Sequence, residues 1–278
     1  MKTPTFLGIG VPRAGTTWLY QLMASHPEIY VPEQRKEVHF FDRYYDRGYQ
    51  WYSQFFPLPQ EQNSQYKAIG EITPHYLYCD KCPERIAQLS SVNKLILLLR
   101  DPVSRAYSHY LFRVRVDNYS ESFEDFIDFV PEAIEWGFYS KGLENYLRYF
   151  SKNQFLVLIY EHIFDDLDFT QNKLAAFLDI NSNFFSPSVV NAKVNKSYQP
   201  KLKRTYALAT KVANNLRERD LYWVINLGKK LGGVKLFGEK KVGFAPMRSD
   251  TKAYLKNLYA KEIPKLEQLL GINLDCWK

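Results

Sequence analysis

A glycine-framed loop with a positive charge inside it follows the first apolar run of the chain. The run Thr5–Val11 leads into GVPRAGTT at residues 10–17, in the order strand, loop, helix. Backbone N–H groups in such a loop, with the start of the helix behind it, favour a bound anion. The spacing of the two glycines matches a nucleotide-binding P-loop, in which lysine follows the second glycine. Here Thr16 stands at that position and the cation is Arg13 inside the loop, so ATP hydrolysis with magnesium fits poorly.

A second candidate for anion binding follows the strongly apolar run KLILLL at residues 94–99. Arg100 comes directly after this run, at the end of a strand where α/β proteins bind ligands. Ser104 and Ser108 are four residues apart and would share one face of the helix that begins at Asp101-Pro102. An arginine and a serine hydroxyl near a helix start suit a doubly charged phosphate. The two segments together predict a ligand with two phosphate-like ends.

A third segment, KEVHFFD at residues 36–42, combines an ammonium, a carboxylate and an imidazole. Either Glu37 or His39 could take a proton from a nucleophile, and a nearby cation could stabilise developing negative charge. In an extended segment, residues two apart point the same way, so Glu37 and His39 would face one cleft.

The elements that must position these residues alternate between strands and helices, which predicts an α/β fold with a P-loop-like central parallel sheet flanked by helices. Strands are expected at Thr5–Val11, Ile29–Val31, Lys67–Ile72, Lys94–Leu99 and Gln154–Tyr160. Helices are expected at Thr16–Ser25, Arg85–Leu89, after Asp101, and at Phe123–Val130, Gly142–Phe150, Gln171–Leu178 and Thr251–Leu270, the last interrupted near Pro264. We expect one domain over residues 1–278, with a basic helical C-terminal cap at about 205–245.

Composition and charge fit this reading. Of the 278 residues, 46% are hydrophobic and 16% aromatic, which indicates a folded globular chain. The net charge is +7, and residues 192–252 hold 15 basic but only four acidic residues. This basic region suggests an anionic acceptor or a peripheral membrane contact; a solvated basic face is an equal alternative.

The cysteines and the chain start are less informative. Cys79 and Cys82 form one C-x-x-C pair without a second pair at metal-ligand spacing, so we expect two ordinary thiols. No signal-peptide pattern and no run of about 20 apolar residues occurs, which favours a cytoplasmic protein.

The run GVPRAGTTWLYQLMASHP at residues 10–27 resembles the 5′-phosphosulfate loop of the sulfotransferase family, which uses 3′-phosphoadenosine-5′-phosphosulfate (PAPS) and yields 3′,5′-ADP. The resemblance implies that Arg100 and Ser108 bind the 3′-phosphate. The looser run at residues 195–204 resembles a loop that closes over the nucleotide, through Lys201 and Arg204. The residues implied around the phosphosulfate are Pro12, Arg13, Ala14, Gly15, Thr16, Thr17 and Trp18.

Residues 36–42 resemble K-E-x-H-F-F-D of the heparan sulfate branch of that family, in which the glutamate is the base. The match implies that Glu37 is the base, that Lys36 supports the transferred group and that His39 positions the acceptor or the base. GEITPHY at residues 70–76 resembles a later E-K-[ST]-P-x-Y segment of the branch, but Ile72 replaces the lysine. The implied acceptor-binding residues are Glu71, His75 and Phe41.

We therefore expect a soluble prokaryotic-type sulfotransferase that acts on a hydroxyl or amine of a carbohydrate or glycoconjugate. A lipid, polyketide or small alcohol is the alternative acceptor. No metal and no nucleic acid partner is expected. The rival readings are a P-loop nucleotide kinase or NTPase, which does not explain Arg100 and Ser108, and an anion-binding module without chemistry, which does not explain Lys36 and Glu37.

Overall fold

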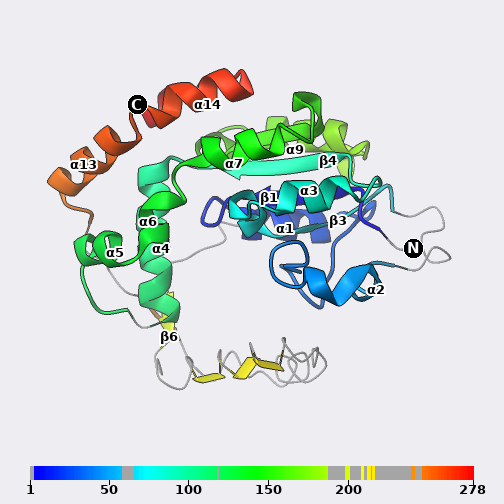
Figure 1. Ribbon diagram of the computed structural model, residues 1–278, viewed down its shortest axis with the longest axis horizontal. Helices are drawn as coiled ribbons and strands as arrows, with labels where there is room; N and C mark the ends of the chain where they lie inside the picture. Colours follow the sequence, from blue (N-terminus) through cyan, green and yellow to red (C-terminus); the bar gives the residue numbers. More distant parts are fainter. Residues whose placement is uncertain are drawn as a thin grey trace.

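A computed structural model describes residues 3–57, 66–117, 119–186 and 246–278, with a few short stretches between residues 198 and 241 (Figure 1). Its centre is a five-stranded parallel sheet with strand order β2-β3-β1-β4-β5. The strands are β1 (Phe6–Gly10), β2 (Ile29–Tyr30), β3 (Ala68–Ile72), β4 (Lys94–Leu99) and β5 (Phe155–Ile159). This confirms the predicted α/β class and all five expected strands.

The sheet is parallel because each strand returns through a helical crossover, and its strands are apolar because helices cover both faces. Every residue of β1 and β3 is buried, as are all but the first of β4. Gly70 is required where β3 passes β1, since a Cβ there would lie 2.3 Å from the carbonyl oxygen of Phe6. Parallel pairing brings the carboxyl ends of β1, β3 and β4 to one edge of the sheet.

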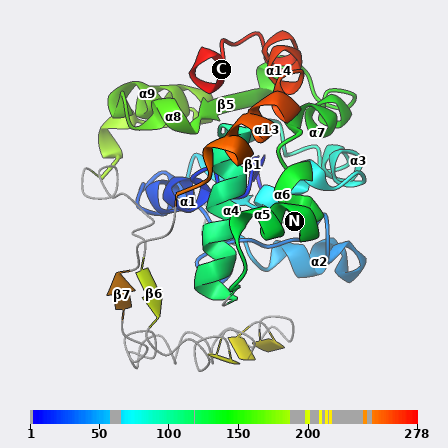
Figure 2. The same ribbon diagram turned by 90° about the vertical axis from the view of Figure 1, so that its left-hand side faces the viewer.

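Helices surround the sheet and extend to one side of it (Figures 1 and 2). They are α1 (Thr16–Ala24), α2 (Gly48–Ser53), α3 (Cys82–Ala87), α4 (Pro102–Val116), α5 (Phe123–Phe129), α6 (Pro131–Glu135), α7 (Tyr139–Tyr146), α8 (Tyr160–Ile163), α9 (Leu167–Leu178), α13 (Ser249–Tyr259) and α14 (Glu262–Leu270). Short 3₁₀ turns are η1 (Tyr45–Arg47), η2 (Pro74–Tyr78), η3 (Lys152–Gln154), η4 (Ser182–Phe184) and η6 (Asp275–Trp277). A separate antiparallel pair joins β6 (Tyr198–Pro200) to β7 (Glu239–Lys241), and β6 lies beside α4.

The start of α4 forms as its sequence predicts. The carboxylate of Asp101 accepts hydrogen bonds from the backbone N–H groups of Val103 and Ser104, at 3.2 and 3.1 Å. Pro102 occupies the first helical position, where no intrahelical N–H is needed. This cap fixes where Arg100 leaves β4, immediately before the helix.

The last predicted helix differs from the structure in where it breaks. The chain forms two helices, α13 and α14, separated at residues 260–261 rather than near Pro264. Pro264 lies in the first turn of α14, where its missing N–H breaks no helical bond. α14 packs on α7 and α13 packs on α4, so the C-terminal helices cover the outer side of the domain.

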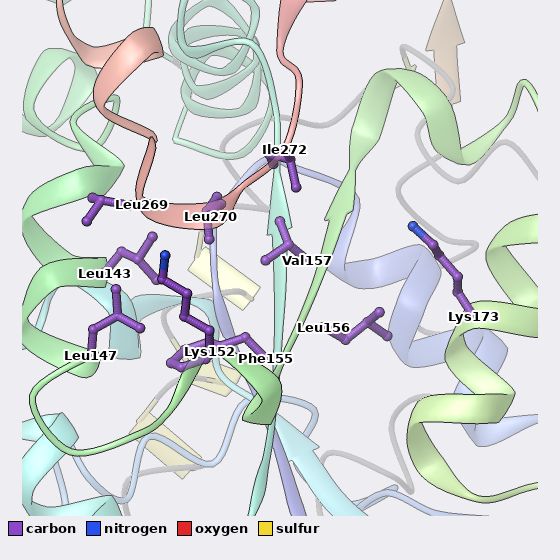
Figure 3. A pocket seen from close by; sticks show the side chains of 10 residues that line it. All are labelled: Leu143, Leu147, Lys152, Phe155, Leu156, Val157, Lys173, Leu269, Leu270 and Ile272. Carbon is purple, nitrogen blue, oxygen red and sulfur yellow. The ribbon is translucent and has the colours of Figure 1, made fainter. Parts of the chain in front are cut away.

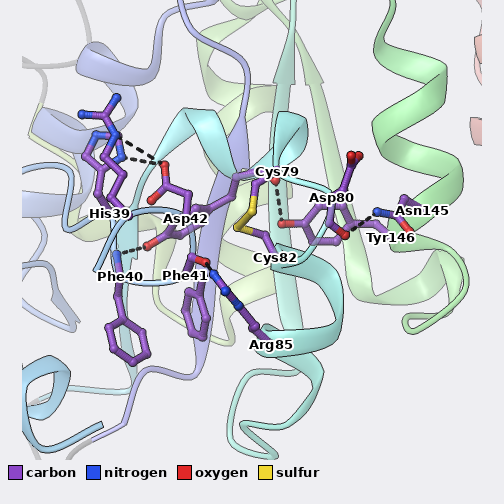
Figure 4. The surroundings of a disulfide bond; sticks show 12 residues. His39, Phe40, Phe41, Asp42, Cys79, Asp80, Cys82, Arg85, Asn145 and Tyr146 are labelled. Carbon is purple, nitrogen blue, oxygen red and sulfur yellow. Dashed lines mark hydrogen bonds and ion pairs between the residues drawn. A yellow bond between two sulfur atoms is a disulfide. The ribbon is translucent and has the colours of Figure 1, made fainter. Parts of the chain in front are cut away.

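Cys79 and Cys82 form a disulfide, which overturns the expectation of two ordinary thiols (Figure 4). Because Cys79 follows η2 and Cys82 begins α3, their Cα atoms lie 5.3 Å apart, within the range a disulfide bridges. Beside it, Arg85 of α3 donates a hydrogen bond to the carbonyl of Phe41 (Figure 4). The disulfide therefore ties the chain directly after η2 to the start of α3.

The predicted basic cap at residues 205–245 lies almost entirely outside the described residues. Among the described residues, no helix is long and apolar enough to cross a membrane.

Candidate active site

The loop after β1 is shaped as an anion cradle. Gly15 adopts a left-handed conformation (φ 92°), and a Cβ there would lie 3.1 Å from the ring of Tyr160. Gly15 also caps α1 without any side-chain hydrogen bond to the first helical turn. The backbone N–H groups of that turn are therefore directed at the loop, where they favour an anion. Ala14 and Trp18 are buried, so of these two only the backbone is placed to contact a ligand.

Arg13 joins the two segments that were predicted to bind phosphate. Its Nε donates a hydrogen bond to Oγ of Ser108, at 3.4 Å, and its guanidinium lies 4.8 Å from the ring centre of Phe112. The Nη1 of Arg100 donates to the carbonyl oxygen of Arg13 at 3.1 Å. The backbone of Arg13 is left-handed (φ 74°), which is uncommon for a residue with a side chain. The loop and the end of β4 thus form one site.

This site gathers positive charge without matching negative charge. Burial, and then the neighbouring guanidinium groups of Arg115 and Arg100, lower the pKa of Arg13 to about 10. Within the described ranges, no carboxylate forms an ion pair with Arg13 or Arg100. Clustered cations that repel one another beside a helix N-terminus are the environment expected of a site for a multiply charged anion.

The second phosphate segment is only partly available to a ligand. Ser104 donates to the carboxylate of Asp101 at 2.6 Å and so belongs to the helix cap. Ser108 faces Arg13 instead. The guanidinium of Arg100 lies 4.4 Å from the ring centre of Tyr160, and its buried Nε has no hydrogen-bond partner. A buried guanidinium N–H without a hydrogen-bond partner is a group that an anion could satisfy.

Lys36 connects the anion loop to the predicted catalytic segment. Its Nζ donates to Oγ1 of Thr17 at 2.9 Å and to Oε1 of Glu37 at 3.1 Å. One ammonium therefore contacts both the first turn of α1 and the candidate base.

His39 is held between two carboxylates. Its Nδ1 lies 2.8 Å from Oδ2 of Asp42, and its Nε2 lies 3.5 Å from Oε2 of Glu37 (Figure 4 shows the Asp42 contact). His39 has a left-handed backbone (φ 58°), and its N–H donates to Oγ1 of Thr73. The segment is therefore a turn and not the extended strand we assumed. Glu37 and His39 converge because the turn directs them together.

The electrostatics of this pair follow from its contacts. Burial alone would raise the pKa of Glu37, but the hydrogen bond to His39 and the charge of Lys36 bring that pKa to about 2. Burial lowers the pKa of His39, but hydrogen bonds to Asp42 and Glu37 outweigh it and leave the pKa above its ordinary value. Glu37 is thus ionised at neutral pH, and its side chain is 30% exposed. Asp42, which the sequence reasoning did not assign a role, orients the imidazole.

Glu71 lies behind this cluster and not on its surface. It is 1% exposed, and its carboxylate accepts hydrogen bonds from Thr73 and Tyr76, both at 2.6 Å, and from Tyr52 at 3.4 Å. Burial raises the pKa of Glu71 to about 7 despite these bonds. Phe41 is also fully buried. Their geometry favours a supporting role over the acceptor contact that the resemblance implied for both.

The aromatic segment around Phe40 builds core and not a sugar groove. Phe40 and Tyr52 stack with ring centres 4.3 Å apart, and both are buried. The aromatic ring beside the catalytic segment is that of Trp136, which lies 5.2 Å from His75. His75 in turn lies 5.3 Å from His39, and burial lowers its pKa to about 4. The sequence alone gave no periodic signal for Trp136.

Two predicted residues, Lys201 and Arg204, lie outside the described residues. Away from this site, a pocket of about 220 Å³ is lined by Leu143 of α7, Leu147 directly after α7, Leu156 and Val157 of β5, and Leu270 (Figure 3). It lies on the early half of an edge strand, whereas the anion loop lies at the carboxyl ends of central strands. We therefore assign the candidate active site to the polar cluster.

Comparisons with known proteins agree with this geometry. The sulfotransferase domain family matches residues 3–220. The human bifunctional heparan sulfate N-deacetylase/N-sulfotransferase 3 is 27% identical over 299 residues, which cover 99% of this chain and 31% of that protein. The human heparan sulfate glucosamine 3-O-sulfotransferase 3B1 is 34% identical over 174 residues, covering 59% of this chain and 43% of that protein. This chain thus spans less than half the length of these relatives.

A crystal structure of a sulfotransferase from Alicyclobacillus acidocaldarius superimposes with a TM-score of 0.71, at 21% identity, over 100% of this chain and 99% of that one. The fold is therefore that of the sulfotransferases. The chain belongs to the sulfotransferase domain family, whose enzymes transfer a sulfuryl group from PAPS. The resemblance inferred from residues 10–27 is confirmed at the level of the family.

The contacts of His39 give a prediction that does not depend on activity. Asp42→Asn should lower the pKa of His39, because it removes both a hydrogen bond to the imidazolium and a negative charge. Arg43→Ala should shift that pKa in the opposite direction, because Arg43 repels the protonated ring. NMR titration of the imidazole signals measures both shifts. Two shifts of the same sign would contradict this account of the site.

Proposed function

We propose that this chain transfers the sulfuryl group of PAPS to a hydroxyl or amine of a carbohydrate acceptor. The observation that carries the proposal is the unpaired arginine cluster at the uncapped start of α1, joined through Lys36 to Glu37. An anion site alone would support only binding. An anion site in contact with an ionised carboxylate supports transfer, since the donor and the acceptor nucleophile would meet between them.

The residues fit PAPS as a two-ended anion. Arg13, Thr17 and the N–H groups of residues 15–18 would hold the 5′-phosphosulfate. Arg100 and Ser108 would hold the 3′-phosphate, consistent with the partnerless Nε of Arg100. When bound, PAPS supplies an activated sulfuryl group whose leaving group is a phosphate. Arg13 and Lys36 lie where their charges would stabilise the negative charge on that leaving group and on the transferred group.

Glu37 is our candidate for the base. It is ionised at neutral pH, partly exposed and in contact with Lys36. A pKa of about 2 makes it a weak base while both partners hold it. We expect its basicity to rise when Lys36 turns from Glu37 toward a bound anion, since that ammonium is one cause of the low pKa. His39, oriented by Asp42, would position the acceptor or hold the carboxylate in place.

The evidence that the acceptor is a carbohydrate is less direct than the evidence for the donor site. Two relatives are named as enzymes of heparan sulfate, and residues 36–42 resemble that branch. Against a heparan-like acceptor, Ile72 is fully buried where the branch has lysine. A lipid, polyketide or small alcohol remains the alternative. A nucleotide kinase or NTPase is disfavoured because Thr16, not lysine, follows Gly15.

The cytoplasmic location and membrane contact expected from the sequence remain predictions.

Donor binding tests the two-ended anion site. Arg100→Ala should weaken the binding of 3′,5′-ADP far more than the binding of 5′-AMP. The reason is that only 3′,5′-ADP carries the phosphate that Arg100 is proposed to bind. Loss of such a charged contact costs about 1.5–3 kcal/mol, or roughly 10–150-fold in affinity. Arg113→Ala is the matched control, since Arg113 lies on α4 but pairs with Asp117. Calorimetry that finds equal losses for both nucleotides would remove Arg100 from the 3′-phosphate site.

The turnover rates of two variants test whether Glu37 is the base. Glu37→Gln keeps the shape of the side chain but removes the proton acceptor, so the rate should fall about 10²–10⁴-fold while 3′,5′-ADP binding survives. His39→Ala should reduce turnover less. If Glu37→Gln keeps nearly full turnover and His39→Ala abolishes it, the two roles are reversed.

Activity should persist in EDTA, because the proposed transfer needs no metal.

An acceptor panel tests the substrate class. Anionic glucosamine oligosaccharides should give the highest kcat/KM, and their KM should rise with salt more steeply than the Kd of 3′,5′-ADP. The reason is that the Debye length falls from about 10 Å at 0.1 M salt to about 3 Å at 1 M, which screens exposed charges. Best turnover with phenols or simple alcohols, insensitive to salt, would refute the glycan acceptor and leave the sulfuryl transfer standing.

A further inference from the structure

Three side chains of metal-ligand type converge at one point of the site. One oxygen of Glu37 and one ring nitrogen each of His39 and His75 lie within 4.8 Å of one another. They come from two segments, the turn at residues 36–42 and the 3₁₀ turn η2, which the fold brings together. Two imidazoles and one carboxylate form a donor set used by zinc sites that keep an open position.

The contact between His39 and Glu37 is suited to a cation. The Nδ1 of His39 faces Asp42 at 2.8 Å, so a neutral ring that donates there directs the lone pair of Nε2 at Glu37. Two acceptors 3.5 Å apart need a cation between them. That cation is a proton when His39 is an imidazolium that donates to Glu37, and a metal ion can take the place of this proton. Donor atoms of a tetrahedral zinc ion lie roughly 3.3 Å apart, given bonds of about 2.0–2.2 Å. The observed separation is therefore close to that of a pair of zinc ligands.

Asp42 supplies the outer contact that such a site requires. A metal-binding histidine generally donates its other ring N–H to a carboxylate, which fixes the tautomer and orients the ring. The bond between His39 and Asp42 has this geometry. The left-handed backbone of His39, held by Thr73, further limits where its ring can point.

His75 completes the set from the opposite side. Its Nδ1 is closed to solvent and has no hydrogen-bond partner. Its ring packs edge-on against Trp136, 5.2 Å away, which limits the directions it can turn. A buried imidazole nitrogen without a partner, next to His39, is a group that a metal ion would satisfy.

We propose that Glu37, His39 and His75 bind a zinc ion and that this binding inhibits sulfuryl transfer. Glu37 and Asp42 offset part of the charge of a dication, although Lys36 and Arg43 also contact them. Nitrogen donors select zinc over magnesium or calcium, which prefer oxygen. The ion would occupy the carboxylate proposed as the base and would repel Lys36, which lies 3.1 Å from Glu37. The inhibitory part of this proposal rests on the proposed function, whereas the zinc site itself does not.

Metal binding tests the site without any activity measurement. The untagged chain should bind one Zn²⁺ by calorimetry, and Co²⁺ should give the intense visible absorption of a four-coordinate site. His75→Ala should abolish both signals. Asp42→Asn should lower the affinity for Zn²⁺ by about 10–100-fold, as expected when the carboxylate that orients a ligand histidine is lost. His162→Ala is the matched control, because His162 is exposed and lies outside the cluster.

The outcomes separate the two proposals. Unchanged Zn²⁺ affinity in His75→Ala, or equal losses in His75→Ala and His162→Ala, would overturn the zinc site. Zinc binding that leaves wild-type turnover unaffected would overturn the inhibition and retain the site. If the chain transfers no sulfuryl group at all, the proposed function fails, while the binding measurements still decide whether the zinc site exists. Inhibition by Zn²⁺ that EDTA reverses is the expected result.

Discussion

The repulsion among half-buried arginines at the carboxyl edge of the sheet is the interaction on which the rest of the site depends. Arg13 lies beside Arg100 and Arg115, and no described carboxylate neutralises it. The chain tolerates this arrangement because aromatic rings lie against all three guanidinium groups and parallel pairing of β1 with β4 brings the loop beside the end of β4. A site assembled in this way is organised for a multiply charged anion before the anion arrives, which lowers the cost of binding it.

The candidate catalytic segment is positioned by buried residues behind it. Glu71 accepts hydrogen bonds from Thr73 and Tyr76, and these residues in turn bind the backbone N–H groups of His39 and Phe40. The turn that carries Glu37 and His39 is thereby fastened to the end of β3. Burial raises the pKa of Glu71 to about 7, while the hydrogen bonds from Thr73 and Tyr76 favour its charged form. Such support gives the small catalytic cluster a defined geometry.

The acceptor side of the site is where this chain departs from the heparan sulfate branch it resembles. Ile72 is buried against Gly8, so no cation extends from that position. His75 and Trp136 instead form the wall beside His39. The disulfide after η2 holds the far end of that wall. The glycine loop that resembles the family's phosphosulfate loop therefore lies opposite a wall to which Ile72 supplies no charge.

The sequence by itself determined the fold class, the five strands and the glycine loop after β1. These rest on local signals: apolar runs, glycine spacing, a helix cap and motif resemblance, all of which act within a few residues. Only the tertiary structure decided that Glu71 and Phe41 are buried, that Cys79 and Cys82 are bonded, and that His75 meets His39. Those outcomes depend on contacts between segments far apart in the chain. A single sequence carries no record of which side chains the packing of β3 and η2 against the turn at residues 36–42 will bring together.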